Sequence, residues 1–430
     1  MSKSPFSRAG LFIWGLSVLF FLYEFFLRSS IGSIAHQIIP ALHLNPKTFA
    51  LMGSAYYLVY AAMQIPAGML IDKYGVRFIL TTAVFVCAGA TLLFSQSTHF
   101  TVALISRSLL ALGSSFAFIG LLVVVVNWFP KRYFSFFSGV SQFIGTMGPL
   151  LAAGPLIGFM NSYQHSWRFT FVIISVFGFT LAILMALTIK NKSQRTQRKL
   201  IYLNLPSLGK TSLLKSLKSS QTWYIAFYSA TVYVSIELLG AMWGTEYLQA
   251  RGFTQNTAAN IISFAWFGYA VGCPLVGFLS DRSNRRKSSL VCCAFLGLFS
   301  TLCALFPKTQ AAWFYATTFF TLGIAAAGQN VGFALMAENT SARIRAASLG
   351  LNNAAITLFN ALIPLIIGYF IFTSSHGLPM QSLKPEHFGG FIVLPILYCI
   401  AILLSLLFIR ETFGKSQHEP MKLKLGTVFD

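Results

Sequence analysis

Charge is scarce in this chain, and negative charge above all. Only 10% of its 430 residues are charged, and 10 Asp and Glu stand against 31 Lys and Arg. A soluble domain carries about a quarter charged residues. Long polar stretches are also few, whereas apolar runs recur that exceed the roughly 18 residues needed to cross a membrane as a helix. The composition, 56% hydrophobic, therefore excludes an ordinary soluble domain and indicates a polytopic helical membrane protein.

Cysteine is rare and does not occur in the polar loops. The six cysteines all lie within apolar segments: Cys87, Cys273, Cys292, Cys293, Cys303 and Cys399. Disulfides are therefore not expected, and the histidines near the expected outer loops lack metal-ligand spacing. The run Gly209-Lys210-Thr211 lacks the upstream glycine and the strand of a phosphate-binding loop. We expect no metal, no cofactor and no enzyme activity.

Twelve apolar segments can be read as membrane spans. They lie near residues 11–34, 48–70, 78–96, 100–127, 136–160, 168–189, 221–247, 257–279, 288–306, 311–337, 346–372 and 389–409. If the N-terminus is cytoplasmic, 24 of the 31 Lys and Arg residues fall in the tails and on the inner loops, and 5 fall on the outer loops. This positive-inside pattern predicts that both termini are cytoplasmic. The net charge of +21 is then expected to meet anionic membrane lipids, not nucleic acid.

One polar stretch divides the spans into two sets of six. We predict an all-α polytopic membrane protein with two pseudo-symmetric six-helix bundles. Their expected bounds are 1–189 and 221–410, joined by a basic cytoplasmic linker over 190–220 and followed by a cytoplasmic tail over 411–430. No cleavable signal peptide is recognisable, because the first apolar stretch is too long. The compact loops are similar to those of bacterial inner-membrane proteins.

The two halves repeat a short pattern. A glycine is followed four residues later by an aspartate and then by cations, after the second span and again after the eighth. The two aspartates, Asp72 and Asp281, are 209 positions apart. Parallel repeats with a substrate site at their interface are a recurrent plan of membrane transporters.

This pattern resembles the signature loop of the major facilitator superfamily. The first copy is carried by Gly68, Asp72, Lys73, Gly75 and Arg77, and the second by Gly277, Asp281, Arg282 and Arg285, without the second glycine. The resemblance covers the whole chain. It implies twelve helices and alternating access, but it does not fix the substrate.

The loop residues are expected to form a gate. Gly68 would let helices approach closely, and Gly75 would permit a tight turn. Asp72 would accept from amides at a helix N-terminus or pair with a cytoplasmic cation. Lys73, Arg77, Asp281 and Arg282 complete this set. A plain solvated turn is the alternative.

Ionisable side chains inside the spans are the candidate functional groups, because charge in hydrocarbon is costly. Arg28 lies about two-thirds through the first span, in the string from Tyr23 to Arg28. The string resembles the first helix of the organic-anion and sugar-phosphate branch of the superfamily, which implies that Arg28, with Tyr23 near it, binds a carboxylate or phosphate. A guanidinium suits this because it stays charged and offers a planar fork of donors. The alternative is a structural pair with Glu24, one helical turn earlier.

Three further groups are candidates for proton coupling: Glu24, Glu237 and Arg107. Displacing Arg28 by the repeat interval of 209 gives Glu237, so we expect these two to face each other across a central cavity. A carboxyl whose cationic partner moves can switch its protonation state. Glu246, near the outer end of the seventh span, is expected to be an interfacial residue.

Polar side chains within the spans complete the expected substrate cavity. They are Gln64, Gln142, Tyr233, Gln329, Asn330, Asn353 and Asn360. Such groups bind substrate or simply join helices.

These features predict a secondary active transporter for a small, anionic substrate. The favoured function is proton-coupled symport of an organic anion into the cell. Efflux of a drug or siderophore-like compound, transport of amino acids or dipeptides, and a non-transporting receptor are the alternatives.

Overall fold

The computed structural model describes residues 7–130, 134–163, 166–189, 217–340, 345–376, 378–379, 382–414 and 417. Within them the regular structure is entirely helical. Most of the expected linker and of the expected C-terminal tail lies outside the described residues.

In the described residues of the N-terminal half there are nine helical segments. They are α1 (Arg8–Ser33), α2 (Ala35–Ala41), α3 (Pro46–Tyr74), α4 (Val76–Ser95), α5 (Phe100–Ser114), α6 (Ala117–Trp128), α7 (Phe134–Ala152), α8 (Gly154–Ser162) and α9 (Trp167–Thr188). Of these, α5 with α6 and α7 with α8 correspond to the expected fourth and fifth spans. The axis bends by 43° between α7 and α8, where Gly154 and Pro155 begin the second segment.

The C-terminal half repeats this plan. Its segments are α12 (Ser220–Glu237), the π-helix η2 (Leu238–Met242), α13 (Gly244–Ala250), α14 (Gln255–Ser283), α15 (Arg286–Leu305), α16 (Ala312–Ala326), α17 (Gly328–Glu338), α18 (Arg345–Ser374), the 3₁₀ helix η4 (Pro385–Ile392), α19 (Val393–Leu403) and the π-helix η5 (Leu404–Phe408). The expected seventh span is thus α12, η2 and α13 in sequence, with a π-helix at its centre.

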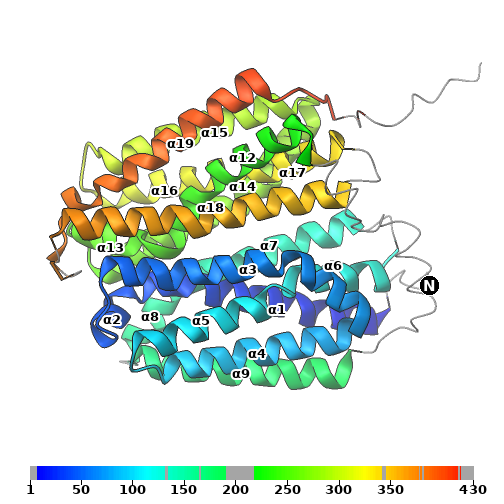
Figure 1. Ribbon diagram of the computed structural model, residues 1–430, viewed down its shortest axis with the longest axis horizontal. Coiled ribbons are helices and arrows are strands. Elements are labelled where there is room, and N and C mark those ends of the chain that lie inside the picture. The colour runs from blue at the N-terminus through cyan, green and yellow to red at the C-terminus, as the bar shows by residue number, and fades with distance from the viewer. Residues whose placement is uncertain are drawn as a thin grey trace, which may run out of the picture.

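The number of long helices agrees with the twelve-helix plan. In the described residues, ten helical stretches are long and apolar enough to cross a membrane, and the bent pair α7 and α8 makes eleven. The 29-residue α3, which packs against α18 over much of its length and then bends away from it, takes the remaining position (Figure 1).

Capping residues set several helix ends. Asn45 and Thr48 form a reciprocal capping box at the start of α3, with Pro46 in the first turn. The side chain of Thr254 accepts from the Thr257 N–H at the start of α14. Gly75, with φ of 84°, ends α3 and confirms the expected tight turn.

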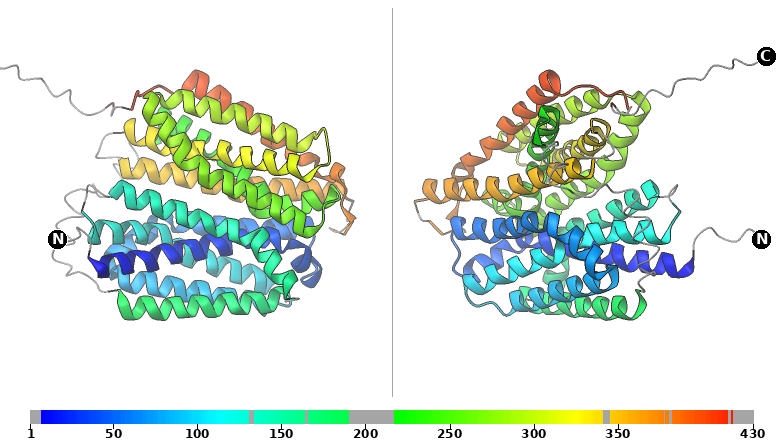
Figure 2. Two further views of the ribbon diagram at one scale, coloured as in Figure 1. Left: turned by 180° about the vertical axis from the view of Figure 1, so that it is seen from behind. Right: turned by 45° about the vertical axis from the view of Figure 1, so that its right-hand side comes forward.

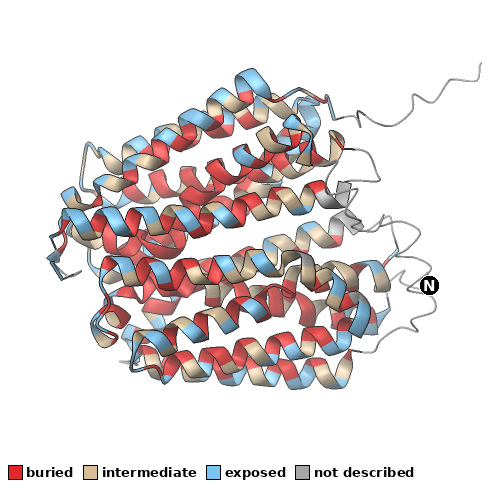
Figure 3. Ribbon diagram, in the orientation of Figure 1, coloured by how far each residue is buried: buried red, intermediate tan, exposed pale blue. Residues whose placement is uncertain are grey.

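The two halves stack as two layers of roughly parallel helices (Figures 1 and 2). The helix α12 is buried on most sides, whereas α9, α15 and α19 expose one face, as do α3 and α18 (Figure 3). In the most apolar window of Ser220–Met242, 94% of residues are buried, against 39% for Trp167–Thr188. The helix that carries Glu237 is therefore central, and the peripheral helices face the membrane.

The halves pack tightly at the end of the molecule opposite to Arg8. A Cβ on Gly32 would come within 2.6 Å of the Ala241 carbonyl oxygen, and one on Gly53 within 2.6 Å of Met242. At the other end of α3, no atom lies within 4 Å of the Cβ position of Gly68. The close helix contact expected at Gly68 is therefore not made in this conformation, in which the halves are closed at the end that carries Gly32 and Gly53.

Candidate functional site

An ion pair joins the two halves at the centre of the molecule. Arg28 Nη2 on α1 lies 2.9 Å from Glu237 Oε1 at the end of α12, and the two side chains are 10% and 1% exposed. The expectation that these residues face each other is confirmed. A buried pair of this kind is costly to break, because one partner is left as an uncompensated charge.

Two tyrosines hold the carboxylate of this pair. Tyr233 OH donates to Glu237 Oε1 at 2.8 Å, and Tyr57 OH on α3 donates to Oε2. The Arg28 guanidinium carbon stands 3.7 Å over the ring of Phe25. Arg28 Nε is buried and has no hydrogen-bond partner among the described residues. The guanidinium therefore keeps a donor that no described protein group satisfies.

Glu24 has a different partner from the one expected. Its Oε2 accepts from Tyr56 OH at 3.2 Å, and the ion pairs of the described residues do not include one between Glu24 and Arg28. The structural pair considered as an alternative is therefore not formed here, because Arg28 turns toward α12. Glu24 is 1% exposed and lies in the same cluster.

Arg107 on α5 donates hydrogen bonds to the backbone of α1. Its Nη1 and Nη2 donate to the carbonyls of Leu27 and Arg28 at 3.0 and 3.2 Å. Its guanidinium also lies 5.1 Å from the centre of the Tyr56 ring. The structure thus brings Arg28, Glu24, Glu237 and Arg107 into one buried cluster.

The predicted amides are distributed over several places. Asn353 Nδ2 on α18 donates to Gln64 Oε1 on α3 at 2.9 Å, which joins the two halves. In the C-terminal half, Gln329 donates to Tyr269 OH at 2.6 Å and Asn330 donates to Cys273 Sγ at 2.9 Å.

Two other predicted amides, Asn360 and Gln142, form no hydrogen bond with Arg28 among the described residues. Asn360 Oδ1 is buried and unpartnered among the described residues. Gln142 is half-buried on α7, and its backbone carbonyl accepts from Thr146.

Tyr23 does not belong to the cluster. Its hydroxyl donates to the Ile174 carbonyl on α9 at 3.1 Å, and its ring packs on Phe177. One residue along a helix turns the side chain by about 100°, so Tyr23 and Glu24 point to different faces. The expected position of Tyr23 beside the substrate is wrong.

Tyr56, Tyr57 and Phe25 are the cluster residues that the sequence did not single out. They are three among 16 Tyr and 43 Phe, and aromatic residues in spans are mostly packing residues. The adjacent Tyr56 and Tyr57 in a span that also carries Gln64 were the one available signal. It does not separate them from other aromatics without knowledge of what they face.

Comparison with known proteins agrees with this architecture. The family model described as Major Facilitator Superfamily matches residues 13–254 and 225–427. The chain belongs to this superfamily. The two overlapping matches cover nearly all of both halves.

Several members of the superfamily are similar along most of the chain. A probable sulfoacetate transporter of Cupriavidus necator is 22% identical over 390 residues, which cover 86% of this chain and 89% of that protein. A probable galactarate/D-glucarate transporter of Bacillus subtilis is 25% identical over 386 residues, with coverages of 80% and 82%. The crystal structure of a bacterial homologue of the lysosomal transporter Spinster, inward-facing and unoccupied, superposes with a TM-score of 0.72 at 17% identity, covering 93% and 96% of the two chains.

The first superfamily signature loop lies where α3 ends and α4 begins. Arg77 Nη2 donates to the Ala186 carbonyl at the end of α9 at 2.7 Å, and Lys73 Nζ lies 5.1 Å from the centre of the Tyr74 ring. The side chain of Asp72 lies outside the described part of the structure. In this conformation Arg77 ties helices within the N-terminal half.

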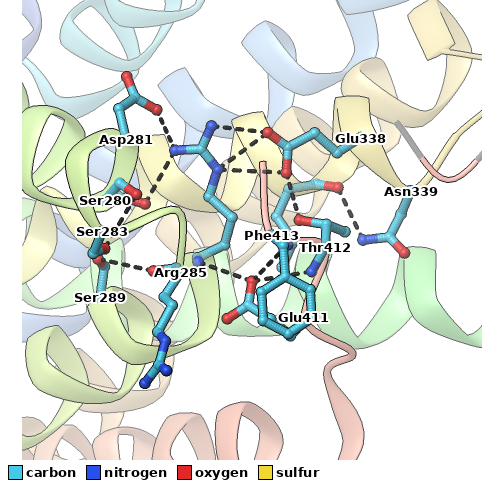
Figure 4. Close-up of polar contacts among 12 residues, drawn as sticks. Ser280, Asp281, Ser283, Arg285, Ser289, Glu338, Asn339, Glu411, Thr412 and Phe413 are labelled. Carbon is cyan, nitrogen blue, oxygen red and sulfur yellow. Dashed lines mark hydrogen bonds and ion pairs between the residues drawn. The ribbon is translucent and has the colours of Figure 1, made fainter. Parts of the chain in front are cut away.

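The second signature loop is built into a larger network (Figure 4). Arg286 forms ion pairs with Asp281 and with Glu338, the latter at 2.8 Å. Glu411 accepts from the N–H groups of Arg286 and Lys287 at the start of α15, both at 2.9 Å. The segment after η5 is thereby held against the end of α14, the start of α15 and the end of α17. Arg282 is exposed beside this network.

Proposed function

We propose that this chain is a proton-coupled symporter that takes up a small organic anion, with Arg28 as the anion-binding residue and Glu237 as the proton carrier. The observation that supports the proposal is the ion pair between these residues, which come from opposite halves. Binding of a ligand or proton at this pair changes the connection between the halves directly.

In the proposed mechanism, the carboxylate of Glu237 and the carboxylate of the substrate alternate as partners of the Arg28 guanidinium. While Glu237 is ionised, it accepts from Arg28 Nη2 and neutralises the cation. A proton on Glu237 removes that negative charge and leaves Arg28 to bind the carboxylate of a substrate. A buried cation without a partner costs about 3–5 kcal/mol, so proton binding and anion binding favour each other.

The two hydroxyls on Glu237 serve both states. Tyr57 and Tyr233 donate to the ionised carboxylate, and one of the two hydroxyls can accept the single O–H of Glu237 when that group carries a proton, while the other still donates. The hydrogen bonds of the Glu24 and Arg107 side chains among the described residues are to the N-terminal half. We assign them to the electrostatic surroundings of the coupling pair.

The substrate class follows from the cation and from the relatives. A guanidinium recognises a planar carboxylate, sulfonate or phosphate by paired hydrogen bonds, and Arg28 Nε is a donor without a described partner. The named relatives include probable transporters of sulfoacetate and of galactarate or D-glucarate. We therefore propose a small organic acid as the substrate.

The orientation in the membrane is part of the proposal. The concentration of Lys and Arg on one set of loops supports cytoplasmic termini. A bacterial inner membrane, with a proton gradient directed inward, is the setting in which the exchange at Arg28 drives uptake. Anionic lipids would contact the basic cytoplasmic surface.

Thermal stabilisation of the purified protein tests the binding site. The ligand panel contains D-glucarate, galactarate, D-glucuronate and sulfoacetate, with amino acids, dipeptides and cationic drugs as contrasts. A ligand that binds the folded state raises the melting temperature by mass action. We expect one or more of the anions to stabilise the wild type and Arg28→Ala to abolish the effect.

Arg8→Ala is the matched control, because Arg8 lies on the same helix and is exposed. Stabilisation by cationic drugs that is independent of Arg28 would favour efflux and overturn the proposal. The stabilising anion is then assayed for uptake into proteoliposomes with an imposed pH gradient. Accumulation of the anion that does not depend on the imposed pH gradient would contradict proton coupling.

A further inference from the structure

Another carboxylate, nine residues after Glu237 along the chain, is buried without a partner among the described residues. Glu246 lies on α13 and is 6% exposed. Its Oε1 is fully buried and has no hydrogen-bond partner among the described residues. The expectation of an interfacial side chain is therefore wrong, because the outer ends of the halves close over it.

Glu246 lies in the segment that seals the outer side. Met242, four residues earlier, fills the space beside Gly53 on α3. Trp243 packs edge-on against Phe49 of α3, with ring centres 5.1 Å apart. Glu246 follows in the first turn of α13, which itself packs against α1 and α2 of the N-terminal half.

Other polar atoms of this segment are also unsatisfied. Trp243 Nε1 and Gln249 Nε2, three residues to either side of Glu246, are buried without hydrogen-bond partners among the described residues. Buried polar atoms are normally paired with protein or water. The segment is thus suited to a second conformation in which water reaches it.

No described cation neutralises Glu246. The element α13 packs against α1, α2, α14, η2 and η4. Their charged and titratable groups are Arg8, Tyr23, Glu24 and Arg28 on α1, His36 on α2, Tyr269, Cys273, Asp281 and Arg282 on α14, and Glu386 and His387 on η4, while η2 has none. On α13 itself only Tyr247 is titratable; Arg251, which follows the helix, donates to Tyr247 OH and to the Leu305 carbonyl.

These groups are engaged elsewhere or directed into solvent. Arg28 pairs with Glu237, and Asp281 pairs at the cytoplasmic end of α14. His36 and Glu386 are exposed. The ion pairs of the described residues do not include Glu246. An ionised carboxylate at this position would be an uncompensated buried charge.

We propose that Glu246 is a second proton-binding site, which takes up a proton from the outer side as the outer seal closes and releases it when the seal opens. The inference rests on the proposed proton-coupled function and extends it. An unpaired buried carboxylate is costly, and the group avoids the cost by taking up a proton. The closed state therefore binds one more proton than the open state, and its population falls as pH rises.

The test measures opening of the outer side directly. Spin labels are placed at Lys47→Cys on α3 and Lys308→Cys in the outer loop before α16, both exposed positions. The exposed Cys292 and Cys399 are changed to Ser. Distance distributions by pulsed electron resonance are recorded in nanodiscs between pH 5 and 9, without substrate.

We expect the ratio of open to closed protein to rise with pH in the parent, by at most about tenfold per pH unit for one proton. Glu246→Gln mimics the protonated group and should stay closed, with less than a twofold change over the range. Glu246→Leu, a second neutral variant, should behave in the same way. Glu386→Gln, an exposed carboxylate on the outer η4, is the control and should match the parent.

The proposal is overturned if Glu246→Gln follows the parent, if the parent shows no pH dependence, or if Glu237→Gln alone removes it. Failure of the proposed function is a separate result. If the proposed function is wrong, D-glucarate at fixed pH would stabilise the wild type and Arg28→Ala equally. That result does not depend on the distance between the two spin labels.

Discussion

Arg28 and Glu237, which form the ion pair between the halves, are separated by 209 residues. The same interval separates the signature aspartates Asp72 and Asp281. Positions related by the internal repeat therefore face each other at the interface, one carrying a cation and the other a carboxylate. The internal repeat thus places the complementary charges of Arg28 and Glu237 at corresponding positions of the two halves.

The geometry of the Arg28 fork yields the first prediction. Arg28→Lys keeps the charge but removes the planar pair of donors. We expect the affinity for an organic anion to fall by roughly 10-fold or more, since a hydrogen bond to a charged group contributes about 1.5–3 kcal/mol. Isothermal titration with the anion that stabilises the wild type measures this. Arg8→Lys should bind as the wild type does, and unchanged affinity of Arg28→Lys would remove the fork from the mechanism.

Neutralising the partner should separate binding from coupling. In Glu237→Gln the side chain is a neutral amide and no longer competes with the substrate anion for Arg28. Anion binding should therefore persist, and its affinity should vary less than about twofold between pH 5.5 and 8. Proton movement with the substrate should be lost, because no carboxyl is left at this position to carry it.

A pH-sensitive dye inside proteoliposomes reports that movement. Normal proton flux in Glu237→Gln would sink the assignment of Glu237 as carrier. The exposed Glu386→Gln, which removes a carboxylate at the outer surface, should retain both binding and flux.

Gly32 tests the closed outer interface. A methyl group there would lie 2.6 Å from the Ala241 carbonyl oxygen, closer than van der Waals contact allows. Gly32→Ala should therefore shift the population toward the outer-open state by tenfold or more, seen as a longer distance between labels at positions 47 and 308. Gly15→Ala on the same helix is the control, because no atom lies within 4 Å of its Cβ position. A closed distribution in Gly32→Ala would mean that the halves do not need this contact.

The hydrogen bonds of Glu411 predict an effect on the stability of the folded protein. Glu411 accepts from two N–H groups at the first turn of α15, as an N-terminal cap does. Glu411→Ala should cost about 1 kcal/mol and lower the melting temperature without changing anion affinity. Glu386→Ala, which removes an exposed carboxylate, should melt as the wild type does. A loss of affinity in Glu411→Ala would instead connect this network to the binding site.

The outline of the fold was available from the sequence. Apolar runs that recur between short polar loops leave helices across a membrane as the way to satisfy the backbone. The repeated loops after the second and eighth spans gave two six-helix halves, and the repeat interval predicted the meeting of Arg28 with Glu237. These features depend on local pattern and on symmetry, which the chain carries directly.

Other parts of the site were decided by tertiary structure. Glu24 is one helical turn from Arg28 in sequence, yet Arg28 pairs across the interface, because the i,i+4 geometry competes with a carboxylate already held by Tyr57 and Tyr233. Tyr23 is adjacent to Glu24 but faces α9, and a shift of one residue changes the helix face. Glu246 is buried only because two halves distant in sequence close around it. Periodicity determines that a side chain lies in a helix, but only the packing of helices determines what that side chain meets.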